Sequence, residues 1–191
     1  DAASVTALNQ QVFGPLKQIL TAYGQGSRLN LVKATQNPVL LKDESLTNLS
    51  AEITTALVAA GVPAQQAGLM GIVYGQARHA TSADLLPLTT SSVIGTAPSS
   101  PYAVAPFNKY GVTFPLDDKH VLSSTEKDEV LAATATFNGV IKAAATAKGL
   151  AFVDANAKML ELAKTSGIQF DGVKYTATFV TGGTFSLDGV H

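Results

Sequence analysis

Asp188 and His191, three residues apart, are the side chains of this sequence best suited to chemistry. Gly189 between them permits a tight bend that brings the carboxylate to the imidazole. A carboxylate that accepts from one ring nitrogen leaves the other nitrogen free to take a proton from a hydroxyl nucleophile, as in a serine-hydrolase triad. Such general-base assistance is worth about 10²–10⁴-fold in rate. On spacing alone, a surface turn that contains both residues is the simpler interpretation.

The neighbouring residues favour the catalytic interpretation. The stretch 181–191, TGGTFSLDGVH, closely resembles the final sequence block of the SGNH hydrolases, also called the GDSL lipase/acylhydrolase family. The resemblance implies that Asp188 orients His191 as the general base of the triad. Residues 143–156 are similar to the helix, strand and helix that precede this block in bacterial surface members, and residues 74–88 resemble their middle insertion.

The nucleophile that the resemblance implies does not occur in these 191 residues. The family carries its serine in a Gly-Asp-Ser-Leu block and completes the oxyanion hole with a Gly and an Asn from two later blocks, and none of these blocks occurs here. We therefore expect residues 1–191 to be the C-terminal part of a single SGNH domain, incomplete at both ends and inactive by itself, with a middle insertion at about 63–111.

No other serine is expected to take the place of the nucleophile. The sequence has no Gly-x-Ser-x-Gly elbow, the motif that exposes a serine at a sharp turn. The serines that we considered stand in turns, caps or strands, where a hydroxyl has a local structural role. These are Ser27, Ser45, Ser91, Ser92, Ser123 and Ser186.

Two functions follow as alternatives. The first is a serine ester hydrolase that acts on a small-molecule, lipid or carbohydrate ester, with Asp188 and His191 as the catalytic residues contributed by this chain. The second is a noncatalytic α/β binding module or surface-lipoprotein segment that keeps the scaffold. An extracytoplasmic location, periplasmic or at the cell surface, is implied by the resemblance only.

Composition excludes several other classes. Thirteen Lys and Arg balance fourteen Asp and Glu without any basic cluster, so nucleic acid is not an expected partner. The absence of cysteine excludes disulfides and thiolate metal sites. No apolar run approaches ~18 residues, so we expect no transmembrane segment. We expect no metal or other cofactor, because His79 and His120 have no partner at metal-ligand spacing.

Apolar periodicity predicts several helices in the first half of the chain. One covers 4–23, with Pro15 kinking or splitting it and Gly24 ending it. Another covers 49–60, and a third begins near Pro63, weakened by Gly68, Gly71 and Gly75. Short extended pieces are predicted at 28–33, 39–42 and 84–96. We interpret Asp43-Glu44 and Asp117-Asp118 as solvated turns, and Gly24-Gln25-Gly26 as a helix end.

The C-terminal third has the clearest pattern. Ser123 and Glu126 form a capping box for a helix that closes at Lys148-Gly149. Residues 150–153 are a short apolar run typical of a buried parallel strand, and Asp154 or Asn156 caps a further helix through Lys164. A hairpin around Asp171-Gly172 follows. This alternation predicts an α/β fold, a three-layer α/β/α sandwich with a mostly parallel sheet.

Overall fold

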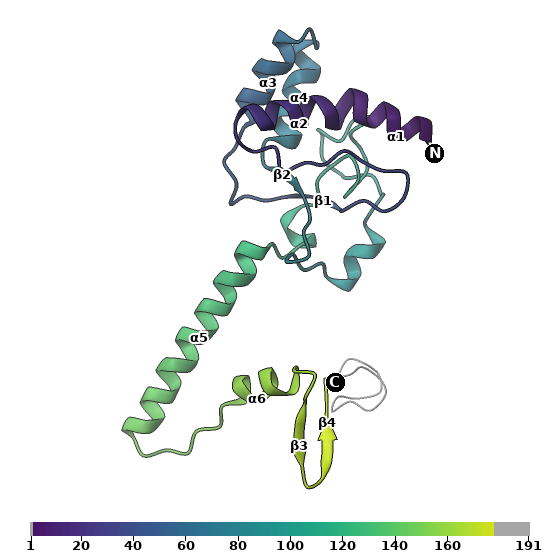
Figure 1. Ribbon diagram of the computed structural model, residues 1–191. Helices are drawn as coiled ribbons and strands as arrows, with labels where there is room; N and C mark the ends of the chain where they lie inside the picture. The colour runs from purple at the N-terminus through teal and green to yellow at the C-terminus, as the bar shows by residue number, and fades with distance from the viewer. Residues whose placement is uncertain (1, 178–191) are drawn as a thin grey trace. The chain divides into compact units, whose positions relative to one another are not determined.

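The structure is a computed structural model that describes residues 2–177. It divides into two compact units, Asp1–Val130 and Leu131–His191. The described residues are a mixture of helix and strand (Figure 1), as the sequence predicts at the coarsest level. The residue pair Asp188 and His191 lies outside the described residues.

A helical rod in three segments opens the first unit (Figure 1). Helix α1 (Ala2–Leu8) runs into a π-helical turn (Asn9–Phe13), and α2 (Gly14–Ala22) follows without a break in the helical backbone. Pro15 lies in the first turn of α2. A proline has no N–H to donate, so one hydrogen bond of a regular α-helix is missing at this point. The wider π turn just before the proline accommodates the missing bond. The rod ends at Gly24, which has a φ of 71°.

Helices α3 (Ser50–Ala59) and α4 (Ala64–Tyr74) form a tightly packed pair. Gly61, with a φ of 88°, ends α3, and Pro63 precedes the first turn of α4, as the sequence predicts. Gly71 has a packing role, because a Cβ there would collide with Thr54 Oγ1 and the Ser50 carbonyl of α3. Gly71 lowers the helix propensity of α4, but it allows α3 and α4 to pack closely against each other.

The strands of this unit are few and short. β1 (Leu40–Lys42) pairs antiparallel with β2 (Ala77–His79), in a register that places Leu41 opposite Arg78. A single parallel bridge joins Leu41 to Leu116 on the other edge of β1. The predicted piece at 28–33 forms no strand, and the predicted extended run at 84–96 forms a bridge at Leu85 followed by a 3-10 helix, Leu88–Ser92.

The hydrophobic core of the first unit joins the rod, the helix pair and the strands. Tyr74 is fully buried in it and donates a 2.6 Å hydrogen bond from its hydroxyl to the Thr113 carbonyl. The core residues come mainly from the rod, the helix pair, the strands and the segment 107–121: Val12, Phe13, Leu16, Leu20, Leu29, Leu40, Leu41, Leu49, Ile53, Leu57, Ala67, Met70, Val73, Tyr74, Ala77, Phe107, Tyr110, Phe114, Leu116 and Val121. Within the region from 63 to 111, the segments 67–77 and 107–110 contribute to this core.

Helix α5 (Ser124–Ala147) begins with the predicted capping box. The Ser123 N–H donates to Glu126 Oε2 at 2.7 Å, and the Glu126 N–H donates to Ser123 Oγ at 3.3 Å. Among the described helices α5 alone is long and apolar enough to cross a membrane, a test that helices of water-soluble proteins also pass. It establishes no transmembrane segment.

The second unit contains two further predicted elements. Asp154 caps α6 (Ala155–Leu162) by accepting from the Ala157 N–H at 2.8 Å. β3 (Ile168–Phe170) and β4 (Val173–Tyr175) form an antiparallel hairpin. Its two-residue turn has positive φ at both positions, 49° at Asp171 and 77° at Gly172, the geometry that Asp-Gly favours.

The prediction of a buried strand at 150–153 is wrong. These residues form no strand, and the side chains of Leu150 and Val153 are 64% and 82% exposed. An apolar run becomes a buried strand only when neighbouring strands pair with it, and no strand pairs with this run among residues 2–177. Both described sheets are two-stranded and antiparallel.

The glycines of α4 provide a matched test of this packing. Gly68→Ala places a methyl group in open space, so we expect it to raise the free energy of unfolding by about 0.5–1 kcal/mol through helix propensity. Gly71→Ala forces α3 and α4 apart, so we expect a loss of about 1–3 kcal/mol. Urea unfolding followed by circular dichroism measures both. Equal effects would contradict the packing role of Gly71.

Candidate functional site

A buried guanidinium organises the polar interior of the first unit. Arg78 Nε donates to Asp43 Oδ2 at 2.5 Å, and its two terminal nitrogens donate to the Asp84 carboxylate at 2.7 and 2.6 Å. The side chains of all three residues are at most 11% exposed. Arg78 comes from β2, Asp43 follows β1, and Asp84 lies in the turn after β2, so the ion pairs connect three segments.

Asp84 extends this network to α5. Its carboxylate accepts from the Thr81 N–H at 2.7 Å and from the Ser124 N–H, in the first turn of α5, at 2.9 Å. The hydrogen bonds from Arg78 contribute most to lowering the pKa of Asp84 far below its ordinary value. The same bonds raise the pKa of Arg78. Both side chains are therefore charged at neutral pH.

Asp43 corrects a sequence prediction. We expected Asp43-Glu44 to form a solvated turn, but Asp43 is buried. Burial by itself would raise the pKa of Asp43, and hydrogen bonds from Ser45 and Arg78 outweigh it, so the pKa is lowered. Glu44 remains at the surface, paired with Lys42. The sequence has no local signal for this difference, because the partner of Asp43 stands thirty-five residues away.

His79, adjacent to Arg78 on β2, is a second buried polar group. Its Nδ1 accepts from the Asn30 backbone N–H at 2.9 Å, and its ring centroid lies 5.5 Å from that of Phe13. Burial, and to a smaller extent the charge of Lys17, lowers the pKa of His79 to about 4. The ring is therefore neutral at physiological pH. Its conformation is fixed by the backbone of one segment and the core of another.

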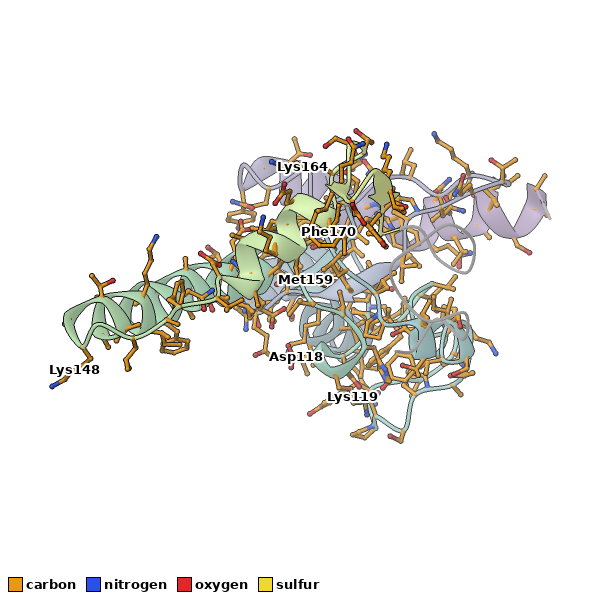
Figure 2. All side chains as sticks on the ribbon, turned by 90° about the horizontal axis from the view of Figure 1, so that it is seen from below. Asp118, Lys119, Lys148, Met159, Lys164 and Phe170 are labelled. Carbon is orange, nitrogen blue, oxygen red and sulfur yellow. The ribbon has the colours of Figure 1, made fainter. Side chains whose placement is uncertain are left out.

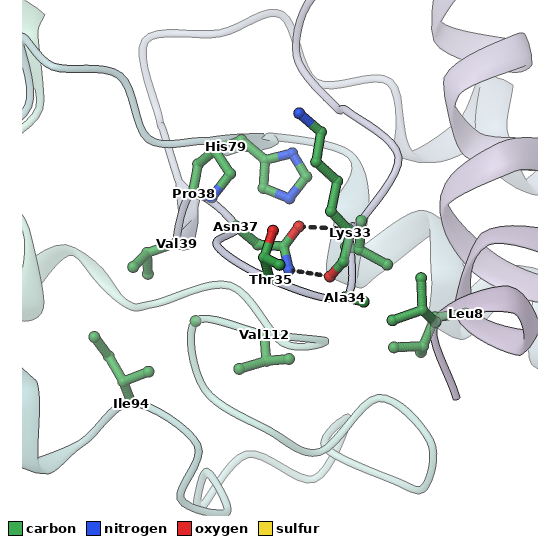
Figure 3. Close-up of a pocket in the computed structure, with 13 residues that line it drawn as sticks. Leu8, Lys33, Ala34, Thr35, Asn37, Pro38, Val39, His79, Ile94 and Val112 are labelled. Atoms are coloured by element: carbon green, nitrogen blue, oxygen red, sulfur yellow. Dashed lines mark hydrogen bonds between the residues drawn. The ribbon is translucent and has the colours of Figure 1, made fainter. Parts of the chain in front are cut away.

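A cavity of about 310 Å³ opens against His79 (Figure 3). It is formed by α1, the loop from 32 to 39 and the segments near Ile94 and Val112. Its lining residues are mostly aliphatic: Val5, Leu8, Val32, Lys33, Ala34, Thr35, Asn37, Pro38, Val39, His79, Ile94, Gly111 and Val112. The sequence gives no sign of this cavity, because its walls come from five separate segments of the chain.

An acidic recess lies near the start of α5. Asp118 faces Glu126, whose hydrogen bond and charge raise the pKa of the Asp118 carboxyl. The pKa of Glu126 is lowered, chiefly by its hydrogen bonds with Ser123. In residues 2–177 no three His, Asp or Glu side chains come together in a way that could hold a metal ion.

Of the five candidate serines within residues 2–177, Ser45, Ser91, Ser92 and Ser123 have structural hydrogen bonds, and the Ser27 hydroxyl forms none with the described residues. Ser45 Oγ donates to Asp43 at 2.5 Å, while Ser91 and Ser92 donate to the carbonyls of Leu88 and Thr89 at 2.7 and 2.8 Å. Ser123 caps α5. The structure brings none of these hydroxyls to His79, and Ser186 lies with Asp188 and His191 outside residues 2–177.

No protein-family model, curated protein or solved structure matches this chain. The resemblance to SGNH hydrolases therefore rests on the residues of the chain itself.

The ion pairs of Arg78 predict a specific dependence of stability on pH. The pKa of Asp84 is lower in the folded chain than in the unfolded chain, so its stabilisation is full above about pH 4 and is lost as the pH falls towards the folded value. Asp84→Asn removes the charge, and we expect it to lower the free energy of unfolding at pH 7 by about 3 kcal/mol. The difference from the wild type should shrink below pH 4.

Chemical denaturation of both proteins between pH 2.5 and pH 7 measures this difference. Glu44→Gln is the control, because Glu44 forms an exposed ion pair and should change stability by less than about 1 kcal/mol. A loss in Asp84→Asn that stays constant down to pH 2.5 would show that the charge of Asp84 is not responsible.

Proposed function

We propose that this chain contributes the Asp and the His of the catalytic triad of a serine ester hydrolase of the SGNH type. The observation that carries the proposal is the pattern of residues 181–191, in which Asp188 and His191 follow a Gly-Gly-Thr-Phe-Ser-Leu run. The nucleophilic serine and the oxyanion-hole residues come from a part of the protein outside residues 1–191. Residues 1–191 by themselves are expected to be inactive.

The proposed reaction proceeds in two steps. His191, oriented by Asp188, takes the proton of the serine hydroxyl as its oxygen attacks the ester carbonyl carbon, and returns that proton to the departing alcohol. His191 then deprotonates a water that attacks the acyl-enzyme, and the carboxylic acid leaves as the serine regains its proton. A small-molecule, lipid or carbohydrate ester is the proposed substrate, and an extracytoplasmic location is proposed on the resemblance.

The surface of the second unit supports the associated proposal of a three-layer α/β/α sandwich. Only Ala145 and Leu162 are buried hydrophobic residues among its described residues. Large apolar side chains are exposed instead, including Met159 and Phe170, both labelled in Figure 2. The exposed set is Leu131, Phe137, Val140, Ile141, Leu150, Val153, Met159, Leu160, Phe170, Val173 and Tyr175. Large apolar side chains exposed in this number normally pack against other structure.

The pattern on α5 specifies what that structure would be. Phe137, Ile141 and Ala144 recur at helical spacing and lie on one face with Val140, all exposed. A helix with one apolar stripe is what covers a sheet in a layered α/β fold. A sheet packed against α5 would therefore cover this exposed stripe.

The hydrolase proposal predicts that activity depends on two residues of this chain. In the full-length protein, His191→Ala and Asp188→Asn should each lower the turnover of p-nitrophenyl acetate by at least about 10³-fold, because the serine loses its base or the base loses its orientation. Initial rates of p-nitrophenol release measure the effect.

Matched variants separate catalysis from folding. His120→Ala and Asp171→Asn change residues of the same types at positions outside the proposed triad, and Asp171 lies in an exposed turn where Asn is tolerated. Both should retain activity. Undiminished turnover in His191→Ala would refute the proposed role of His191, and a full-length protein without esterase activity would favour the noncatalytic binding module.

A further inference from the structure

The cavity beside His79 combines an apolar wall with one polar group that has no partner. The His79 side chain lines the cavity, and the residue is only 6% exposed. Within residues 2–177 its Nε2 forms no hydrogen bond. Figure 3 shows the imidazole among the lining residues, with Leu8, Val112 and Ile94 also bordering the cavity. Among residues 2–177 no buried side-chain nitrogen or oxygen lacks a hydrogen-bond partner, so Nε2, which forms no hydrogen bond there, has accessible surface that water or a ligand can reach.

The tautomer of His79 determines what Nε2 can bind. The Asn30 backbone N–H can only donate, so Nδ1 must carry a lone pair and accept. Because the ring is neutral, its single proton is on Nε2. This nitrogen is therefore a hydrogen-bond donor, and a ligand that binds it must offer an acceptor oxygen.

The charge around the cavity favours an anionic acceptor. Among the described residues, Lys33 is the one charged residue that lines it, and no Asp or Glu of residues 2–177 does so. The loop that carries Lys33 is closed by Asn37, whose amide donates to the Lys33 carbonyl at 2.8 Å and whose Oδ1 accepts from the Lys33 N–H at 2.7 Å (Figure 3). The backbone at the cation is thus held in place before any ligand arrives, which lowers the entropic cost of binding.

The size of the cavity limits the apolar part of the ligand. A volume of about 310 Å³ lies at the lower end for small-molecule sites and is about twice that of the ~150 Å³ apolar cavity that admits benzene. A short alkyl chain or a single aromatic ring fits this volume. A sugar would leave its hydroxyls against aliphatic side chains, without partners.

We propose that this cavity is a binding site for a small apolar monocarboxylate, an alkyl or aryl acid, whose carboxylate accepts from His79 Nε2–H and pairs with Lys33. The hydrocarbon part of the acid contacts Leu8, Ile94 and Val112. The site lies within the first unit and binds its ligand whether or not the protein hydrolyses esters.

Binding of hexanoate to the whole chain tests the proposal. Methyl-resolved NMR should show saturable shifts of the Leu8, Ile94 and Val112 signals. Hexanamide, which keeps an acceptor but lacks the charge, should bind more weakly, and hexylammonium should not bind, since its cation meets Lys33 and a donor. Equal affinity for hexanoate and hexylammonium, shifts confined to other methyl groups, or no saturable shift with any probe would each overturn the proposal.

Two variants identify the contacts. His79→Asn keeps an acceptor for the Asn30 N–H but removes the Nε2 donor, and we expect hexanoate affinity to fall at least tenfold. Lys33→Met removes the charge of an exposed residue without disturbing the core, and we expect a threefold to tenfold loss, while Lys119→Met, an exposed lysine outside the cavity, should bind like the wild type. Unchanged affinity in Lys33→Met would refute the carboxylate assignment even if His79→Asn fails to fold.

Discussion

The need to neutralise one buried guanidinium shapes the first unit more than any other single interaction. Arg78 is almost completely buried, and an unpaired charge there would cost several kcal/mol. It is satisfied only when Asp43 after β1 and Asp84 after β2 both approach it, so the strand register and the turn that follows β2 are determined together. Because Asp84 also accepts from the first turn of α5, the same charge fixes where that helix begins.

The alternation of side chains along β2 connects this network to the cavity. Successive residues of a strand point to opposite faces, so Arg78 turns to the carboxylates while His79 turns to Phe13 and Asn30. One face of the strand is satisfied completely within the chain. On the other face, beside an aliphatic cavity, His79 Nε2 has no hydrogen-bond partner within residues 2–177, which is why we propose a ligand there and not at the ion pairs.

The two units differ in how much of their apolar surface they bury. The first buries its hydrophobic residues in a core that joins helices and strands. The described part of the second buries few of them and presents an apolar stripe on α5 together with the exposed run at 150–153. The proposed sandwich would cover the stripe on α5. The proposed hydrolase and the proposed carboxylate site thus depend on separate parts of the chain and can be tested separately.

The sequence by itself determined the features that depend on neighbouring residues: the capping box of Ser123 and Glu126, the helix end at Gly24, the cap at Asp154 and the hairpin turn at Asp171-Gly172. The Asp188 and His191 pattern is of the same local kind. Tertiary structure alone decided that Asp43 is buried, that Gly71 is a packing residue and that His79 faces a cavity. In each case the residue's partners are distant in the sequence, and apolar periodicity does not predict which distant residues meet. For the same reason the prediction of a buried strand at 150–153 is wrong. The apolar composition of this run permits burial, but only neighbouring strands can bury it.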